Sequence, residues 1–377
     1  MATDDPALET LLLPFEQDLL AWPTAGGALF LRARDGWPLH RRPLEGLLCE
    51  QSFKPDAEAL QRSGLEVVEP GDDARYPLVL VLPPRQRDEA RALYARAIAS
   101  TAPGGRVVAC VANNEGARSG EDDLRKLAGP VGSLTKHKCR VFWTAPLHDA
   151  GSAARVDDGL LDQWQALDAP RTVAGGRFTS RPGVFAWNRV DPASALLADQ
   201  LPPDLAGRAA DLGAGFGYLS VELLQRCPGI AALDLYEAEG RALQLARRNL
   251  APLESQAVIG YHWHDVTAGL PERYDVIVSN PPFHTQGRAD RPDIGRRFIA
   301  VAADALKPGG RLWLVANRHL PYEEVLNASF GSVRTVAQQD GFKIIEAVKA
   351  RPVQPERAPK PFNKADLRRL AGRDPQQ

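Results

Sequence analysis

An internal repeat constrains the fold of this chain more than any other feature of its sequence. Several short motifs occur twice, in the same order, with the second copy 198 to 205 residues after the first. The pairs are Tyr76 and Tyr274, Pro83-Pro84 and Pro281-Pro282, Pro103-Gly-Gly-Arg106 and Pro308-Gly-Gly-Arg311, and Val111-Ala-Asn113 and Val315-Ala-Asn317. A repeat of this length indicates one folding unit that is present twice. We therefore expect two similar domains in tandem.

Both copies alternate short apolar runs with helical patterns, which is typical of βαβ units around a mainly parallel sheet. The second copy predicts strands at 208–212, 230–236, 258–262, 274–279 and 311–315, helices at 219–225, 239–250 and 296–306, and a terminal hairpin from 333–336 and 342–348. The first copy predicts strands at 78–82, 107–111 and 140–144 and a helix at 87–99. The predicted fold class is α/β, with two tandem Rossmann-like domains.

Composition and the positions of Pro and Gly divide the chain into four parts. The predicted parts are a first domain at 1–150, a linker rich in Pro, Gly and Asp at 151–176, a second domain at 177–352, and a basic tail at 353–377. The whole chain has a net charge of −1, but the part after residue 286 holds 17 Lys and Arg against 10 Asp and Glu. This positive end is either a surface for an acidic partner or a solvated tail.

Other classes of protein are disfavoured by the composition. The 377 residues hold four widely spaced Cys, with no Cys or His spacing typical of a zinc site or a disulfide framework. The acidic start lacks the layout of a signal peptide, and no apolar run approaches the roughly 18 residues that cross a bilayer. We expect a cytoplasmic protein without a metal site or a membrane span.

The first motif with chemical content is Asp211-Leu-Gly-Ala-Gly-Phe-Gly217, between a predicted strand and a predicted helix. Gly213, Gly215 and Gly217 allow a tight turn whose backbone approaches a ligand closely. Glu237 ends the next strand, where a carboxylate accepts both ribose hydroxyls of an adenosine-containing ligand. The GxGxG spacing favours S-adenosylmethionine (SAM) over NAD, with a plain structural turn as the remaining alternative.

The second motif is Asn280-Pro281-Pro282-Phe283, directly after the strand at 274–279. The two prolines stiffen the loop at the edge where open α/β sheets bind ligands. The Asn280 side-chain oxygen and the Pro281 carbonyl can accept the two N–H bonds of an exocyclic base amine. The lone pair of the amine then faces a methyl donor, so orientation of the amine supplies most of the rate enhancement of methyl transfer. Phe283 offers a flat face on which a flipped-out base can stack.

With these motifs the chain resembles the class I SAM-dependent methyltransferases, and more narrowly the bacterial ribosomal RNA guanine-N2 methyltransferases with two tandem domains. The narrower resemblance rests on several ordered motifs of the second half. They are Pro182-Gly-Val-Phe185, Asp191, Ser194, Asn280-Pro-Pro-Phe-His284, Val315-Ala-Asn-Arg-His-Leu-Pro-Tyr322, Val325-Leu326, Phe330-Gly331 and Phe342-Lys343. The segment from Leu320 to Gly331 is more similar to the small-subunit enzymes than to the large-subunit ones.

The resemblance implies roles for individual residues. Asp211 and the three turn glycines line the methionine end of SAM, Glu237 binds the ribose, Asp265 binds the adenine amine, and Phe185 and Ser194 shape the entrance. His264 and His284 are candidate general bases, although the amine needs little help before transfer. Cations around the target loop are candidate phosphate contacts, namely Arg288, Arg291, Arg296, Arg297, Arg318 and Lys343.

The resemblance also implies that the first domain is a degenerate copy that captures RNA and supports catalysis. Its segment from Gly27 to Gly36 lacks GxGxG, and Leu82 replaces the asparagine before its prolines. Lys136, Lys138 and Arg140 are its candidate phosphate contacts.

The predicted function is transfer of a methyl group from SAM to the N2 amine of a guanine in 16S ribosomal RNA, by a monomer that acts on ribosomal RNA or a ribosomal subunit. Three alternatives remain: a large-subunit guanine, a protein glutamine or DNA adenine as the acceptor, and a non-catalytic RNA-binding assembly factor.

Overall fold

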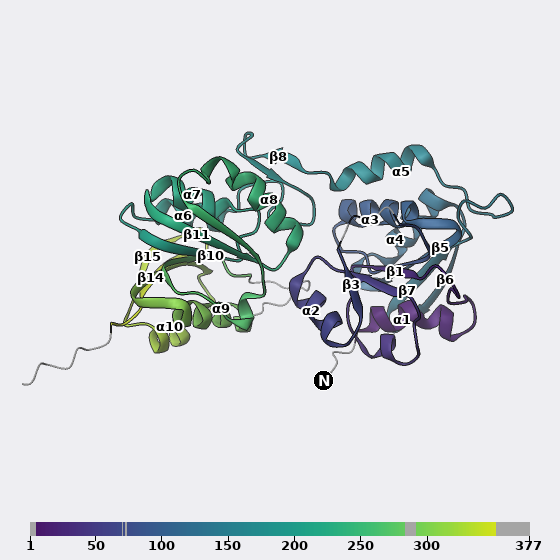
Figure 1. Cartoon of the computed structure of the whole chain (residues 1–377), viewed down its shortest axis with the longest axis horizontal. Helices are drawn as coiled ribbons and strands as arrows, with labels where there is room; N and C mark the ends of the chain where they lie inside the picture. Colours follow the sequence, from purple (N-terminus) through teal and green to yellow (C-terminus); the bar gives the residue numbers. More distant parts are fainter. Residues whose placement is uncertain (1–4, 70, 72–73, 283–291, 352–377) are drawn as a thin grey trace, which may run out of the picture.

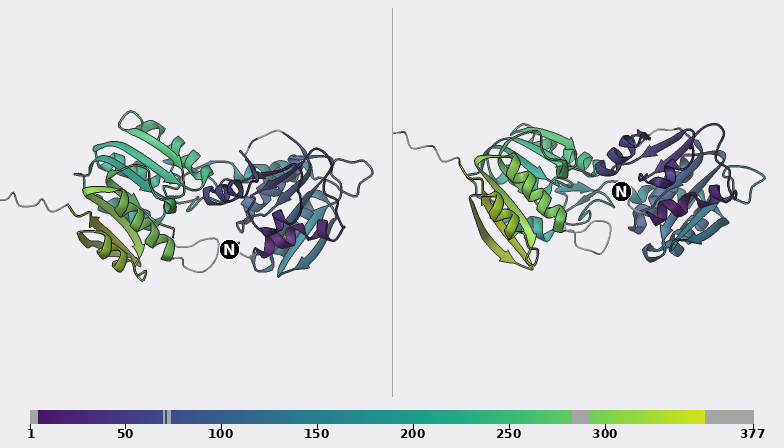
Figure 2. Two further views of the ribbon diagram at one scale, coloured as in Figure 1. Left: turned by 60° about the horizontal axis from the view of Figure 1, so that its bottom comes forward. Right: turned by 90° about the horizontal axis from the view of Figure 1, so that it is seen from below.

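The structure is a computed structural model that describes residues 5–69, 71, 74–282 and 292–351. It contains two seven-stranded sheets, which lie side by side along the long axis of the molecule (Figures 1 and 2). The two tandem α/β domains expected from the repeat are therefore confirmed.

The first sheet has the strand order β3-β2-β1-β4-β5-β7-β6. Its strands are β1 (Ala28–Leu31), β2 (Leu47–Glu50), β3 (Glu66–Val68), β4 (Tyr76–Val81), β5 (Thr101–Ala112), β6 (Val131–Lys136) and β7 (Cys139–Thr144). Its helices are α1 (Pro6–Glu16), α2 (Lys54–Arg62), α3 (Arg87–Ala99), α4 (Ala117–Ala128) and α5 (Asp158–Gln165). Neighbouring strands are parallel except at β7, which runs antiparallel to β5 and β6.

The second sheet repeats this topology in the order β12-β11-β10-β13-β14-β16-β15, with β16 as its antiparallel member. Its strands are β10 (Ala206–Leu212), β11 (Gly229–Glu237), β12 (Val258–Trp263), β13 (Tyr274–Ser279), β14 (Leu306–Asn317), β15 (Ser332–Gln339) and β16 (Phe342–Val348). Its helices are α6 (Pro192–Gln200), α7 (Tyr218–Arg226), α8 (Gly240–Leu250), α9 (Pro292–Ala305) and α10 (Glu323–Ser329). The predicted strands, helices and terminal hairpin of this domain are confirmed.

Each sheet is the middle of three layers. Residues of α6, α7 and α8 share one buried apolar cluster with the second sheet, and residues of α9 and α10 form a separate cluster with it. In the first domain α3, α4 and α5 belong to one cluster and α1 to the other. Amphipathic helices that bury their apolar stripes on both faces of a parallel sheet give this layered fold.

The segment predicted as a linker, 151–176, contains helix α5, which packs against α3 in the first domain. Trp164 on α5 is 4% exposed, and the Arg91 guanidinium lies 5.0 Å from its ring centroid. The segment ends in β8 (Arg171–Val173), which pairs with β9 (Phe178–Ser180). The crossing between the domains therefore takes only a few residues around position 170.

The two domains meet through corresponding loops, one after β2 and one after β11. The Lys54 N–H donates to the Ala238 carbonyl (2.8 Å), and the Gly240 N–H donates to the Ser52 carbonyl (2.8 Å). Phe53 lies between these two bonds and forms an isolated antiparallel bridge with Glu239. The indole N–H of Trp263 also reaches the Ser52 carbonyl (3.0 Å).

Candidate active site

The glycine turn connects β10 to α7, and all three glycines have positive φ: 76° at Gly213, 55° at Gly215 and 90° at Gly217. Such values favour glycine because a Cβ atom makes them strained. At Gly217 a Cβ atom would also lie 2.6 Å from Leu250 Cδ1, so this glycine allows α7 to pack on α8. At Gly215 a Cβ atom would meet nothing within 4 Å. The middle of the turn therefore faces open space, as a ligand cradle requires.

Asp211 lies at the end of β10 beneath this turn and is fully buried. Its Oδ2 accepts a hydrogen bond from Ser220 Oγ (2.8 Å), whereas Oδ1 has no hydrogen-bond partner among the described residues. Burial, with a smaller effect from the negative charge of Glu237, raises the pKa of Asp211 to about 7. A buried acceptor without a partner is costly. A hydrogen bond from a bound ligand would remove that cost.

Glu237 ends β11 beside the turn. Its Oε2 accepts the Gly215 N–H (2.7 Å), and its Oε1 accepts the Glu239 N–H (2.8 Å). Burial raises the pKa of Glu237. Each carboxylate oxygen still has an acceptor site, because a carboxylate has about four in all. The side chain is held in place by backbone donors and keeps the capacity to accept two hydroxyls.

Asp265 follows β12 and caps a short 3-10 helix. Its Oδ1 accepts hydrogen bonds from the backbone N–H (2.8 Å) and the hydroxyl (2.7 Å) of Thr267. The neighbouring His264 has its Nε2 2.7 Å from the Gly269 carbonyl. This geometry commits that nitrogen to a backbone acceptor, which disfavours His264 as a general base.

Asn280 is held from the opposite side by the first turn of α6. Its Nδ2 donates to Asp191 Oδ2 (3.0 Å) and to Ser194 Oγ (2.9 Å). The carboxylate of Asp191 can only accept, so the amide group must present its NH₂ to α6. The Asn280 Oδ1 is therefore turned away from these two partners.

A small cavity of about 40 Å³ joins the two motifs. Its lining consists of Phe185, Ala186, Asp191, Ser194, Gly213, Ala214, Gly215, Phe216, Tyr218, Leu219 and Asn280. The predicted residues Asp211, Gly217, Glu237, Asp265, Pro281 and Pro282 are not part of this lining. Pro281 is buried and Pro282 is exposed beside Asn280. Phe283, like His284, Arg288 and Arg291, lies outside the described residues.

The sequence did not assign the role of Asp191 and Ser194 in holding Asn280, although both belong to the motifs that carried the resemblance. The available signal was local: Asp191 followed by Pro192 is typical of an N-cap and the first helical position. In the structure Asp191 caps α6, since its Oδ2 accepts the Ser194 N–H (2.9 Å). Asn280 lies 86 to 89 residues away from these two residues in the sequence, and no sequence pattern indicates that they are in contact.

Strand register aligns the first domain with this site. Leu31 pairs with Glu50 and Val81 as Leu212 pairs with Tyr236 and Ser279, so Gln51 corresponds to Glu237 and Leu82 to Asn280. Gln51 Oε1 accepts the Phe53 N–H (2.9 Å), as Glu237 does with Glu239, but its Nε2 donates to the Ala33 carbonyl (2.7 Å). The counterpart of the glycine turn contains Arg32 instead, with φ of 55°.

Three of the predicted phosphate contacts are already bonded within the protein. Arg297 Nε donates to the Thr267 carbonyl (2.8 Å). Arg140 forms an ion pair with Glu121. Lys343 is 4% exposed and donates to Glu323 Oε1 (2.5 Å) and the Leu320 carbonyl (2.9 Å). Lys343 is too buried to contact a phosphate, so that prediction is wrong. The ion pair with Glu121 disfavours Arg140, but 32% of its side chain is exposed, so its role stays a prediction.

Within the described ranges, no group of three or more His, Cys, Asp or Glu is arranged to hold a metal ion. No helix in this part of the chain is long and apolar enough to cross a membrane.

Comparison with known proteins gives the family. Residues 175–346 match the model of the Methyltransferase small domain. The chain is 30% identical over 272 residues to ribosomal RNA small subunit methyltransferase C of Shewanella amazonensis, covering 72% of this chain and 77% of that protein. It is 34% identical over 214 residues to the Escherichia coli O7:K1 protein of the same name, covering 55% of this chain and 61% of that protein.

A solved structure extends the likeness to both domains. The 16S rRNA N2 G1207 methyltransferase of T. thermophilus, in complex with AdoMet and guanosine, superimposes with a TM-score of 0.73 at 26% identity. The match covers 92% of this chain and 93% of that one. The resemblance drawn from the sequence is thus confirmed, including its small-subunit branch. The chain belongs to the ribosomal RNA small subunit methyltransferase C family of methyltransferases.

Proposed function

We propose that the chain transfers the methyl group of SAM to the N2 amine of a guanine in 16S ribosomal RNA, and that Asn280 orients the amine. The observation that supports this most directly is the pair of hydrogen bonds from Asn280 Nδ2 to Asp191 and Ser194. They fix the amide plane before substrate binds and leave Oδ1 for the incoming amine.

The residues around the glycine turn fit SAM. The unpartnered Oδ1 of Asp211 is suited to the ammonium of the methionine moiety, and Glu237 is suited to the ribose hydroxyls. Asp265 is assigned to the adenine amine, at the end of the neighbouring strand. The open space at Gly215 lets the backbone approach the ligand. Bound SAM supplies a methyl group on a sulfonium, which is a strong electrophile.

The chain's own part in catalysis is orientation. The lone pair of a guanine amine is delocalised into the ring, so the amine is a weak nucleophile. Asn280 Oδ1 and the Pro281 carbonyl accept its two N–H bonds, and Pro282 stiffens the loop. The N2–C bond then forms as the S–C bond breaks, S-adenosylhomocysteine leaves, and the nitrogen releases one proton to water. Phe283 is assigned as the stacking surface for the base.

We further propose that the first domain captures RNA and supports the second, that the basic tail at 353–377 contacts RNA, and that the chain acts as a monomer in the cytoplasm. The reciprocal contact between the domains supports the monomer, because one chain already contains both halves of a two-fold arrangement. Lys136 and Lys138 remain the phosphate contacts assigned to the first domain, at the turn between β6 and β7.

The test uses purified full-length protein, labelled SAM, and both naked rRNA and assembled subunits from cells that lack the enzyme. Products are digested to nucleosides and identified by mass spectrometry. N2-methylguanosine in 16S rRNA is the expected result. Methylation of 23S rRNA, protein or DNA contradicts the assigned acceptor, and SAM binding without any transfer to RNA contradicts the assigned chemistry.

A further inference from the structure

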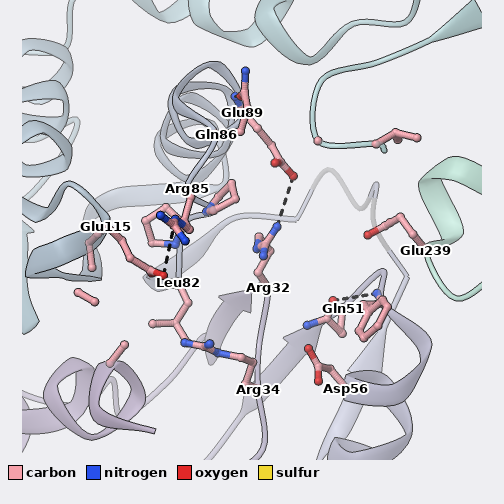
Figure 3. A pocket seen from close by; sticks show the side chains of 18 of the residues that line it. Arg32, Arg34, Gln51, Asp56, Leu82, Arg85, Gln86, Glu89, Glu115 and Glu239 are labelled. Atoms are coloured by element: carbon pink, nitrogen blue, oxygen red, sulfur yellow. Dashed lines mark hydrogen bonds and ion pairs between the residues drawn. The ribbon is translucent and has the colours of Figure 1, made fainter. Parts of the chain in front are cut away.

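A second cavity among the described residues is larger than the one at the glycine turn. It has a volume of about 390 Å³ and lies between the carboxyl edge of the first sheet and the second domain (Figure 3). The first domain contributes Leu82-Pro83-Pro84, and the second domain contributes Gly183 to Phe185, Trp187 and Glu239. Both domains are therefore needed to build it.

This cavity occupies the place in the first domain that the active site occupies in the second. Pro83 and Pro84 correspond to Pro281 and Pro282 in the repeat. Phe185 lines both this cavity and the small cavity beside Asn280, so the two spaces adjoin at this residue. A strand of RNA that places one base at Asn280 can thus place a neighbouring base here.

The cavity cannot hold a methyl donor in the manner of the second domain. Figure 3 shows the side chain of Arg32 projecting into it, with an ion pair to Glu89 (3.3 Å). Gln51 stands where a ribose-binding carboxylate is required, and Leu82 cannot accept an amine. The site therefore has room for a ligand but lacks the groups for the chemistry.

Two exposed aromatic rings face this space. Phe185 is 68% exposed and Phe53 is 37% exposed, and both line the cavity. Two exposed rings that line one cavity offer a flat ligand apolar faces on which to stack. Single-stranded nucleic acids are bound by stacking bases on such rings and on arginine side chains.

The cations around the cavity are each paired with a carboxylate, including Arg34, which pairs with Asp5 (3.1 Å). Glu89 pairs with Arg32 and with Arg241 (2.8 Å), and Arg241 also pairs with Glu239 (3.0 Å). Arg85 forms an ion pair with Glu115 (3.8 Å), and Figure 3 shows this pair at the side of the cavity. A phosphate group gains little electrostatic stabilisation in such surroundings. A flat, uncharged base with hydrogen-bonding edges fits them better.

We infer that this cavity is a second base-binding site, which holds the base of an unpaired nucleotide adjacent to the target guanine, stacked on Phe185. The inference rests on the proposed function, since it takes RNA as the substrate. It gives the degenerate domain a specific function, which is to bind the base next to the one that is methylated.

The test measures binding of a single-stranded RNA of about ten nucleotides with one central guanine, and of the same RNA with abasic residues on both sides of that guanine. We expect the wild type to bind the complete RNA about fivefold or more tightly, the size of one base-stacking contact. Phe185→Ala should bind both RNAs alike, and Phe185→Tyr should restore the preference. The ratio of the two dissociation constants should change little with salt concentration, because phosphate contacts are common to both RNAs.

Trp37→Ala is the matched control, since Trp37 is 62% exposed but does not line the cavity. It should keep the preference of the wild type. A wild type that does not distinguish the two RNAs, or binds neither, overturns the inference. An equal loss of affinity for both RNAs in Phe185→Ala overturns it as well. Failure of the proposed function shows separately, as absence of methyl transfer to guanine by the wild type.

Discussion

Lys54 and Gly240 stand at equivalent positions of the two domains, and each donates a backbone hydrogen bond to the other domain's loop at 2.8 Å. The acceptors, Ser52 and Ala238, are equivalent as well. Reciprocal contacts of this kind are typical of two-fold symmetric dimers, in which residue i contacts j and j contacts i. The repeat has therefore kept, within one chain, the contact pattern of a symmetric pair. The second-domain loop is the one that follows Glu237.

This contact can be removed by one substitution. Lys54 is the first residue of α2, a position that tolerates proline, and Phe53 has the extended backbone that precedes proline well. Lys54→Pro deletes the N–H that donates to Ala238. We expect a loss of about 1 kcal/mol in the free energy of unfolding, measured by urea, and a rise of up to about fivefold in the SAM dissociation constant, measured by calorimetry.

Lys54→Ala is its control, because it removes the same side chain and keeps the N–H. The alanine variant should bind SAM like the wild type. Equal SAM affinity in the proline and alanine variants contradicts a role of this contact in holding the loop after Glu237.

Asn280→Ala tests the orientation of the amine. We expect the turnover number to fall by about two to three orders of magnitude, as loss of a preorganised polar contact typically gives, with SAM affinity near that of the wild type. Turnover is measured with labelled SAM on the accepted RNA substrate. Asn327→Ala, an exposed asparagine on α10, should leave turnover unchanged. Wild-type turnover in Asn280→Ala contradicts the mechanism.

Ser194→Ala tests how the Asn280 amide is held. The variant deletes one of the two acceptors of Nδ2 but keeps the Asp191 cap of α6. We expect about a tenfold lower turnover number, the typical net effect of one hydrogen bond, with little change in SAM affinity. Ser332→Ala on the exposed edge strand β15 is the control. A change in SAM affinity alone indicates that Ser194 shapes the cofactor entrance instead.

The pKa of Asp211, raised by burial to about 7, gives a pH dependence with a definite sign. The ordinary value is about 3.9. The folded protein therefore holds this proton more tightly than the unfolded chain, and the free energy of unfolding falls as pH rises from about 4 to 7. SAM affinity should rise over the upper part of that range, because the ammonium favours the charged carboxylate.

Calorimetry of SAM binding between pH 6 and 7 checks this prediction, with Asp211→Asn as the comparison. The change in SAM affinity with pH should be clearly smaller in the variant, which cannot ionise at this position. An unchanged slope assigns the pH dependence to another group, such as Glu237, whose pKa burial also raises.

The sequence predicted the catalytic domain better than the first domain. GxGxG, Asn-Pro-Pro and apolar strands such as 274–279 are local signals, since each follows from the backbone or side-chain needs of adjacent residues. In the first domain β3 has only three residues and begins with Glu66, so its pattern is too short to detect. The contact between Lys54 and Ala238 is made by backbone atoms, for which side-chain patterns carry no information.

Alanine substitutions at Gly215 and Gly217 should distinguish an effect on SAM binding from an effect on folding stability. Gly215→Ala meets no atoms within 4 Å but has φ of 55°, so it should cost about 1 to 2 kcal/mol of unfolding free energy and place a methyl group in the open space of the turn. SAM binding should weaken strongly. Gly217→Ala adds a clash with Leu250 at 2.6 Å to a φ of 90°, so its loss of stability should be larger. Urea unfolding and SAM calorimetry on the same samples measure both effects. A Gly215→Ala variant that binds SAM like the wild type contradicts the placement of the cofactor at this turn.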